Sequence, residues 1–187
     1  MLFRSVVGHV GRFAEQKNHT FLLEIFAALA QKRSDAVLLL VGGGAREDEI
    51  RKRVQALGLQ ERVKFLGVRN DINRVMQAMD TFVFPSFFEG LGVVVIEAQT
   101  TGLPCFVSDR VPLAANLTDH VYYLPLSESA DYWANEILCH FAAFIRRDMH
   151  GQVAAQHFDI VENAKWLQEF YLNEYQNSTV DGVHPGI

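Results

Sequence analysis

The 187-residue sequence predicts an α/β fold, in which a doubly wound parallel sheet of about six strands is covered by helices on both faces. Short apolar runs alternate along the chain with longer stretches of helical periodicity, as they do in successive right-handed βαβ units. The run at 36–41 is apolar at every position, which is typical of a parallel strand with helices on both sides. A strand, a glycine turn and a helix follow one another at 81–101, which fits a Rossmann-like sheet.

Each expected element has a local signal in the sequence. The first helix follows Asn18, a residue suited to the N-cap, and its apolar residues recur on one face. Asp71 is expected to cap the third helix, and Gly102 followed by Pro104 ends the fourth. Strands are predicted at 5–10, 36–41, 63–66, 81–84, 104–107 and 121–124, and helices at 19–31, 47–57, 72–79 and 93–101.

The character of the chain changes after residue 127. Two amphipathic helices are predicted there, at 132–146 and 161–175, joined by a polar link. We therefore divide the chain into a Rossmann-like core at 1–126, C-terminal helices at 127–176 that pack on the same domain, and a disordered tail at 177–187.

Composition and charge exclude several classes of protein. Hydrophobic residues make up 49% and charged residues 21%, so neither a disordered nor a fibrous chain is expected. The net charge of −5 argues against a general nucleic-acid binder. Cys105 and Cys139 show no metal-like spacing, nor do the seven histidines, and Cys105 is expected to be buried in a strand. The apolar run at 38–41 is too short to span a bilayer, and residues 1–4 do not resemble a signal peptide. These features favour a reduced, cytoplasmic setting.

The stretch 84–98 carries the strongest chemical signal. Gly90 and Gly92 lie between a predicted strand and a helix N-terminus, where free main-chain N–H groups and the helix dipole favour an anion. Glu89 and Glu97 flank this turn, and a carboxylate beside an anion site makes sense where it accepts hydrogen bonds from ligand hydroxyl groups. A sugar nucleotide offers both a diphosphate and hydroxyls.

Three motifs resemble those of the retaining GT-B glycosyltransferases of group 1, and they occur in the family's order. They are residues 11–18 (GRFAEQKN), residues 65–69 (FLGVR), and the Glu-x7-Glu pair formed by Glu89 and Glu97. The match runs from about residue 6 to 126 and is most like bacterial exopolysaccharide or capsule transferases. The resemblance implies the C-terminal, donor-binding half of a GT-B fold.

The resemblance also implies roles for individual residues. Arg12 and Lys17 would neutralise the departing diphosphate without a metal, Glu89 would contact the donor sugar, and Glu97 would bind the ribose hydroxyls. Each has a plainer explanation: the two cations could be solvated loop charges, Glu97 an exposed helix residue, and the turns ordinary strand ends. The remaining donor-binding residues implied are Gly11, Gly67, Val68, Gly90 and Leu91, with main-chain groups near Val68 reading the nucleobase and those of Gly90 and Leu91 binding phosphate.

The implied reaction is transfer of a hexosyl group from a nucleotide sugar, with a UDP-sugar expected, to a glycan or lipid-linked acceptor with retention of configuration. The acceptor-binding N-terminal domain of the family has no counterpart in this chain, so the chain alone is expected to be inactive. The whole enzyme is expected in the cytoplasm, with possible peripheral association at the inner face of the membrane. One departure concerns a glutamate that many members carry in the loop at 110–117, for which Asp109 or Asn116 could substitute.

Four other interpretations are open or weaker. A nucleotide-sugar epimerase of GT-B fold would share this sheet and phosphate site, and a non-catalytic binding or assembly module could retain the fold. Gly42, Gly43 and Gly44 invite a dinucleotide-binding interpretation, but the G-x-G-x-x-G spacing and its acidic residue are missing. His9 lies near the end of the first strand, where a buried core histidine is the simpler interpretation.

Overall fold

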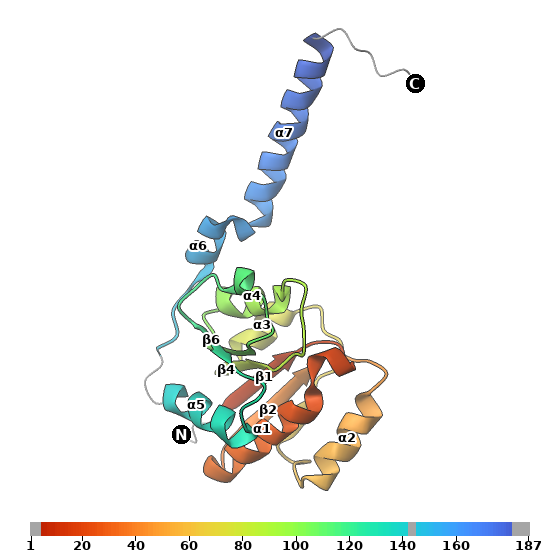
Figure 1. The fold of residues 1–187 in the computed structure, drawn as a ribbon, viewed down its shortest axis with the longest axis vertical. Coiled ribbons are helices and arrows are strands. Elements are labelled where there is room, and N and C mark those ends of the chain that lie inside the picture. Colours follow the sequence, from red (N-terminus) through yellow and green to blue (C-terminus); the bar gives the residue numbers. More distant parts are fainter. Residues whose placement is uncertain (1–4, 142–144, 181–187) are drawn as a thin grey trace.

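The computed structural model describes residues 5–141 and 145–180, with side chains as far as residue 177. Its centre is a six-stranded sheet in the order β3-β2-β1-β4-β5-β6, and every pair of neighbouring strands is parallel (Figure 1). The predicted doubly wound parallel sheet is therefore confirmed. The strands are β1 Val6–Val10, β2 Val37–Val41, β3 Val63–Phe65, β4 Thr81–Phe84, β5 Cys105–Ser108 and β6 Val121–Leu124.

The helices begin close to the predicted positions. Asn18 and Asp71 occupy the N-cap positions of α1 and α3, but neither side chain makes a capping hydrogen bond. Asp71 instead accepts hydrogen bonds from Arg69, at 2.8 Å. The helices are α1 His19–Lys32, α2 Glu47–Ala56, α3 Ile72–Gln77, α4 Val93–Thr100, α5 Ala130–Phe141, α6 His150–Val153 and α7 Ile160–Val180, with 3-10 turns at Glu15–Lys17 and Leu113–Ala115.

Two hydrophobic layers hold the helices onto the sheet. On one face, α1, α2 and α5 bury side chains such as Leu29 and Trp133 against Phe106 of β5. On the other face, α3, α4 and α6 bury residues such as Val95 against Phe82. Figure 1 shows the two sets of helices on opposite sides of the strands. Burial of these apolar surfaces is the main favourable term in folding.

The sheet reverses its order between β1 and β4. From β1 the chain moves outward to β2 and β3, then returns to the other side of β1 with β4. The β1–β2 ladder covers all five residues of each strand, whereas the β1–β4 ladder pairs only Val7 with Thr81 and Gly8 with Phe82. We call the region beyond that last pair, at the carboxyl ends of β1 and β4, the switch point. Doubly wound sheets bind ligands at this position.

Glycines allow the loop after β2 to lie against the loop after β1. Gly42 has a positive φ of 136°, and a Cβ atom there would lie 2.0 Å from the carbonyl oxygen of Gly11. A Cβ atom on Gly44 would lie 2.6 Å from the carbonyl oxygen of Phe13. These glycines therefore serve a close approach of two backbones, and any side chain would force the loops apart.

The C-terminal region differs from the expectation that residues 127–176 pack on the domain. Helix α5 packs against α1, with the ring centroids of Phe21 and Trp133 5.7 Å apart. Helix α7 does not pack on the domain: every described side chain from Ile160 to Asn177 is exposed, and the helix projects away from the sheet (Figure 1). Residues 177–180 continue α7, and the remainder of the predicted tail lies outside the described residues. Of the helices described, none has the length and apolarity that a bilayer span requires.

The side chain of Arg146 joins the segment before α6 to the domain. The guanidinium group of Arg146 donates to main-chain carbonyls at and just beyond the C-terminal ends of α3 and α4. The backbone of Arg147 also passes close to Gly102, where a Cβ atom would lie 1.9 Å from the Arg147 carbonyl oxygen. The four carbonyl oxygens that accept from Arg146, at 2.7 to 3.2 Å, belong to Thr101, Gln77, Met79 and Met76.

Candidate functional site

Two loops meet at the switch point, one after β1 and one after β4. The carbonyl oxygen of Gln16 accepts a hydrogen bond from the Phe87 N–H at 2.8 Å. The side-chain amide of Gln16 donates to the Phe88 carbonyl oxygen, also at 2.8 Å. The sequence predicted both loops at this edge, but it gave no reason to single out Gln16, a polar residue within the motif at 11–18. These bonds hold the two loops in register.

The central contact of the site is an ion pair between Lys17 and Glu89. Lys17 Nζ lies 2.6 Å from Glu89 Oε1, and the two side chains are only 15% and 8% exposed. The ammonium group also lies 4.6 Å from the centroid of the Phe84 ring. Because both charges are largely removed from water, losing either partner would leave the other without compensation. Two of the predicted catalytic residues are therefore in direct contact, and the contribution of Phe84 was not predicted.

The glycine turn before α4 is available for an anion. Gly92 is the N-cap of α4 with a φ of 81°, a left-handed conformation that favours glycine. Within the described residues, the N–H groups of Gly90 and Leu91 donate no hydrogen bond. A Cβ atom on Gly90 would meet nothing within 4 Å, so Gly92 is the glycine that the turn requires. Free N–H groups at the start of a helix form a suitable phosphate site.

Arg12 and Glu97 stand further from the ion pair. Arg12 is exposed in the loop after β1 and forms no ion pair with any residue in the described ranges. Glu97 projects from α4 with an exposed side chain, and partial desolvation raises the pKa of its carboxyl group. In the described structure, no hydrogen bond or ion pair joins either residue to Lys17 or Glu89. Among the residues described, no three His, Cys, Asp or Glu side chains gather in a way that could hold a metal ion.

The third motif lies beside the glycines that follow β2. Gly67 has a φ of 66°, and its carbonyl oxygen accepts from the Gly42 N–H at 2.9 Å. The side chain of Val68 is 81% exposed and lies against Gly43, where a Cβ atom would be 3.4 Å from Val68 Cγ2. Gly11 joins the same edge, because its N–H donates to the Val41 carbonyl oxygen at 2.9 Å. The loops after β1, β2 and β3 therefore form one connected surface.

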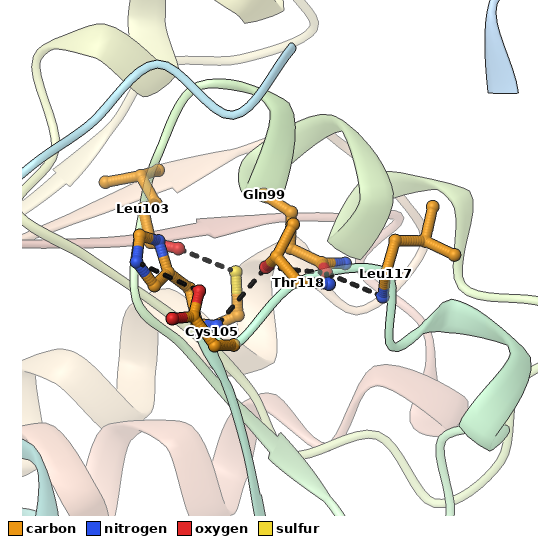
Figure 2. Close-up of polar contacts among 7 residues, drawn as sticks. Gln99, Leu103, Cys105, Leu117 and Thr118 are labelled. Atoms are coloured by element: carbon orange, nitrogen blue, oxygen red, sulfur yellow. Dashed lines mark hydrogen bonds and ion pairs between the residues drawn. The ribbon is translucent and has the colours of Figure 1, made fainter. Parts of the chain in front are cut away.

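The loop after β5, which lacks the family's glutamate, is fixed by the buried side chain of Gln99. Its amide nitrogen donates to the Ala115 carbonyl oxygen at 2.7 Å. Its oxygen accepts from the N–H groups of Leu117 and Thr118, both at 3.0 Å (Figure 2). Neither proposed substitute for the glutamate contacts the Lys17–Glu89 pair. Asp109 accepts from the Leu126 N–H, and Asn116 is exposed. Cys105 lies in the same region, buried as predicted, and burial raises the pKa of its thiol.

Two buried histidines lie beneath the loop after β1. His9 is 0% exposed and His19 is 4% exposed, and their ring centroids are 4.8 Å apart. Burial lowers the pKa of His9 well below its usual value and, with help from Arg46 and Lys17, lowers that of His19 to about 4. Both rings are therefore neutral at pH 7. His9 is buried, as the sequence suggested, but only its Nδ1 atom has a hydrogen-bond partner in the described structure.

A well-defined cavity lies elsewhere, at the amino ends of the strands. It measures about 320 Å³ and includes Arg33, Asp80 and Arg146 in its lining. These charged groups already have partners: Arg33 pairs with Asp35, Asp80 accepts from the Val6 N–H, and Arg146 donates to backbone carbonyls. The cavity contains none of the predicted site residues, so the loops at the switch point are the better candidate.

Comparison with known proteins agrees with the resemblance found in the sequence motifs. The family model described as "Glycosyl transferases group 1" matches residues 4–137. The putative glycosyltransferase EpsF of Bacillus subtilis is 41% identical over 135 residues, which cover 72% of this chain and 35% of EpsF. An Escherichia coli enzyme, UDP-Gal:alpha-D-GlcNAc-diphosphoundecaprenol alpha-1,3-galactosyltransferase, is 38% identical over 103 residues, which cover 54% of this chain and 27% of that enzyme.

A solved structure shows the same fold. Anabaena Alr3699/HepE, in complex with UDP and glucose, superposes with a TM-score of 0.74 and 27% sequence identity. The superposition covers 90% of this chain and 48% of the Anabaena protein. The chain thus spans about half the length of this solved relative and between about a quarter and a third of these two curated relatives.

Proposed function

This chain belongs to the group 1 glycosyl transferases, and on that premise we propose that it is the donor-binding half of a hexosyltransferase. The whole enzyme would move a hexosyl group from a nucleotide sugar to a glycan or lipid-linked acceptor in polysaccharide biosynthesis, with retention of configuration. The observation that carries the proposal is the desolvated Lys17–Glu89 pair beside the free N–H groups of Gly90 and Leu91. These groups suit a ligand with both an anionic diphosphate and neutral hydroxyls.

The proposed roles follow from the chemistry of each group. Lys17 and Arg12 bind the diphosphate and stabilise the charge that it gains as the sugar departs, with no metal ion required. Glu89 holds Lys17 in place with one oxygen and can accept from a sugar hydroxyl with the other. Glu97 accepts hydrogen bonds from the ribose hydroxyls. The raised pKa of its carboxyl fits a group that gains by acquiring donors.

The donor and acceptor classes are supported by the relatives. The Anabaena structure contains UDP and glucose, and the name of the Escherichia coli enzyme specifies UDP-Gal and a diphosphoundecaprenol-linked acceptor. We propose that this chain likewise takes a UDP-sugar, with main-chain groups at Gly67 and Val68 beside the base. A lipid-linked acceptor would place the enzyme in the cytoplasm at the inner face of the membrane.

We further propose that an acceptor-binding N-terminal domain completes the site. The exposed apolar side chains of α7 support this, because a helix with so much apolar surface in water is normally covered by a partner. Closure of two domains would exclude water from the reacting groups, so the chain alone is expected to bind a nucleotide without transferring sugar. The α7 residues assigned to this contact are Trp166, Leu167, Phe170 and Tyr171.

Isothermal titration of the chain with UDP, GDP and ADP tests the proposal. UDP is expected to bind most tightly. The Lys17→Met/Glu89→Gln double variant avoids an unpaired buried charge and is expected to weaken binding by about tenfold or more. Arg12→Ala should weaken it by a smaller factor, and Lys52→Ala, an exposed cation on α2, should leave it unchanged. Failure of all three nucleotides to bind would refute the proposal.

A further inference from the structure

The two strands at the switch point are bridged by a side chain where their ladder ends. The last β1–β4 pair is Gly8 with Phe82, although both strands continue beyond it. One residue further along β4, the Val83 carbonyl oxygen lies 2.9 Å from Nδ1 of His9. A carbonyl oxygen can only accept, so Nδ1 carries the hydrogen. His9 therefore supplies the donor that the ladder no longer provides to this buried carbonyl.

The imidazole ring of His9 is held tightly between the two strands and α1. It stacks on Phe84 with centroids 5.5 Å apart and meets the edge of His19 at 4.8 Å. The ring is fully buried. Because the proton is on Nδ1 and burial, together with the nearby charge of Lys17, opposes a second one, Nε2 has a bare lone pair. Neither strand can shift relative to the other without moving this ring.

The opposite edge of the ring supports the loop that carries Lys17. A Cβ atom added to Gly11 would lie 3.2 Å from His9 Nε2 and 3.3 Å from Lys17 Cε. Nε2 has no hydrogen-bond partner in the described structure, and its proximity to Gly11 places this edge of the ring beneath the loop. One ring thus spans from the Val83 carbonyl on β4 to the Gly11 turn on β1.

We propose that His9 is a positioning residue that sets the separation of the two donor-binding loops. The loops that it spaces make the Lys17–Glu89 ion pair and the hydrogen bonds from Gln16 to Phe87 and Phe88. Loss of the His9–Val83 bond would free the loop after β4 to move relative to the cation on the loop after β1. This inference rests on the proposed function for its effect on nucleotide binding, but its effect on the loops themselves can be measured without any nucleotide.

Three variants distinguish an effect on the spacing of the two loops from a general loss of domain stability. His9→Asn keeps a donor nitrogen at the same number of bonds from the backbone as Nδ1, so it can still reach Val83. His9→Phe keeps an aromatic ring but leaves the Val83 carbonyl without a donor. Ile137→Ala is the control, because Ile137 is buried in α5 at the opposite edge of the sheet and its truncation destabilises the domain without touching the switch point.

Amide hydrogen exchange of Phe87, whose N–H bonds to Gln16, is the readout in the nucleotide-free chain. We expect exchange about tenfold or more faster in His9→Phe, and within about threefold of wild type in His9→Asn and Ile137→Ala. Unchanged exchange in His9→Phe would overturn the proposal. So would equal acceleration in Ile137→Ala, because the effect would then reflect stability alone.

Nucleotide binding provides the second readout. His9→Phe is expected to weaken UDP binding by about tenfold, whereas His9→Asn and Ile137→Ala should stay within about threefold of wild type. A His9→Phe variant that binds as well as wild type would overturn the positioning role. If the wild-type chain binds no nucleotide, the proposed function fails, and the exchange of the Phe87 amide still decides whether His9 positions the loops.

Discussion

Helices α1 and α7 are both amphipathic in sequence, yet their surroundings are opposite. Helix α1 buries its apolar face, including Leu22, Phe26 and Leu29, against the sheet and α5. Helix α7 is longer, and all its described side chains are exposed, including Trp166 and Phe170. The comparison shows that an apolar helical face in the sequence predicts a packing surface for the helix, but not whether that surface belongs to the same domain. For α1 the partner is in this chain, and for α7 it is not among the described residues.

The largest expected difference comes from the same truncation made in both helices. Leu29→Ala removes a fully buried side chain from α1 and should cost about 2–5 kcal/mol of stability. Leu172→Ala removes a side chain that is 52% exposed on α7 and should change stability by less than about 0.5 kcal/mol. Urea unfolding of both variants measures this. Similar losses would show that α7 packs on the domain in solution.

Acid should destabilise the domain through its buried histidines. The pKa of His19 is about 4 in the folded chain and near 6.5 when unfolded, so the unfolded state binds more protons between these values. Stability is therefore present above pH 6.5 and is lost as the pH falls towards 4. This histidine alone contributes a loss of about 2 kcal/mol between pH 7 and pH 5. His9, whose pKa is also lowered by burial, adds to the loss.

Urea unfolding at pH 7 and pH 5 measures this loss, and a His19→Asn variant should show a smaller dependence on pH. Helix α7 contains no histidine, so the effect belongs to the domain alone. A wild-type chain that is equally stable at both pH values would contradict the buried, neutral state of His19.

A substitution at Arg146, between the domain and α7, should lower the free energy of unfolding by an intermediate amount. Arg146→Met leaves the carbonyls at the ends of α3 and α4 without their donors. Because Arg146 is partly exposed to water, we expect a loss of about 1–2 kcal/mol. Arg146→Lys keeps the charge but offers three donors instead of the planar fork, so it should recover only part of the loss. Full recovery by lysine would show that charge alone matters there.

The smallest effect should come from removing most of α7. A chain that ends at Lys165 loses Trp166 and keeps Trp133, whose buried ring then reports unfolding without interference. Its stability should match that of the intact chain within about 0.5 kcal/mol. A clear destabilisation would mean that α7 supports the domain after all.

Local patterns predicted most of the sheet. The segments 81–84 and 121–124 were placed without error because each is a short apolar run between polar or turn residues. The all-parallel arrangement also followed, since each strand is separated from the next by a helix or a long connection. Helix α6 was missed, because four residues carry too little periodicity to be recognised.

The site was predicted in outline but not in its contacts. Lys17 and Glu89 were chosen through separate motifs, and their pairing across 72 positions depends on the strand order, which no local pattern encodes. The contact of Lys17 with the Phe84 ring and the hydrogen bond from His9 to Val83 also depend on the strand order, so they were not predicted either. The separate position of α7 could not be predicted either, because its sequence has the same amphipathic pattern as a packed helix.

The reversal of strand order also has a consequence for synthesis on the ribosome. His9 and Val83 are 74 positions apart, so β1 emerges long before the strand that covers its second edge. In that interval β1, β2 and β3 can form only half of the sheet, with the backbone of β1 unpaired along one side. Such an edge is a template for association between nascent chains. Translational pausing before β4 would therefore be expected to lower the yield of folded protein.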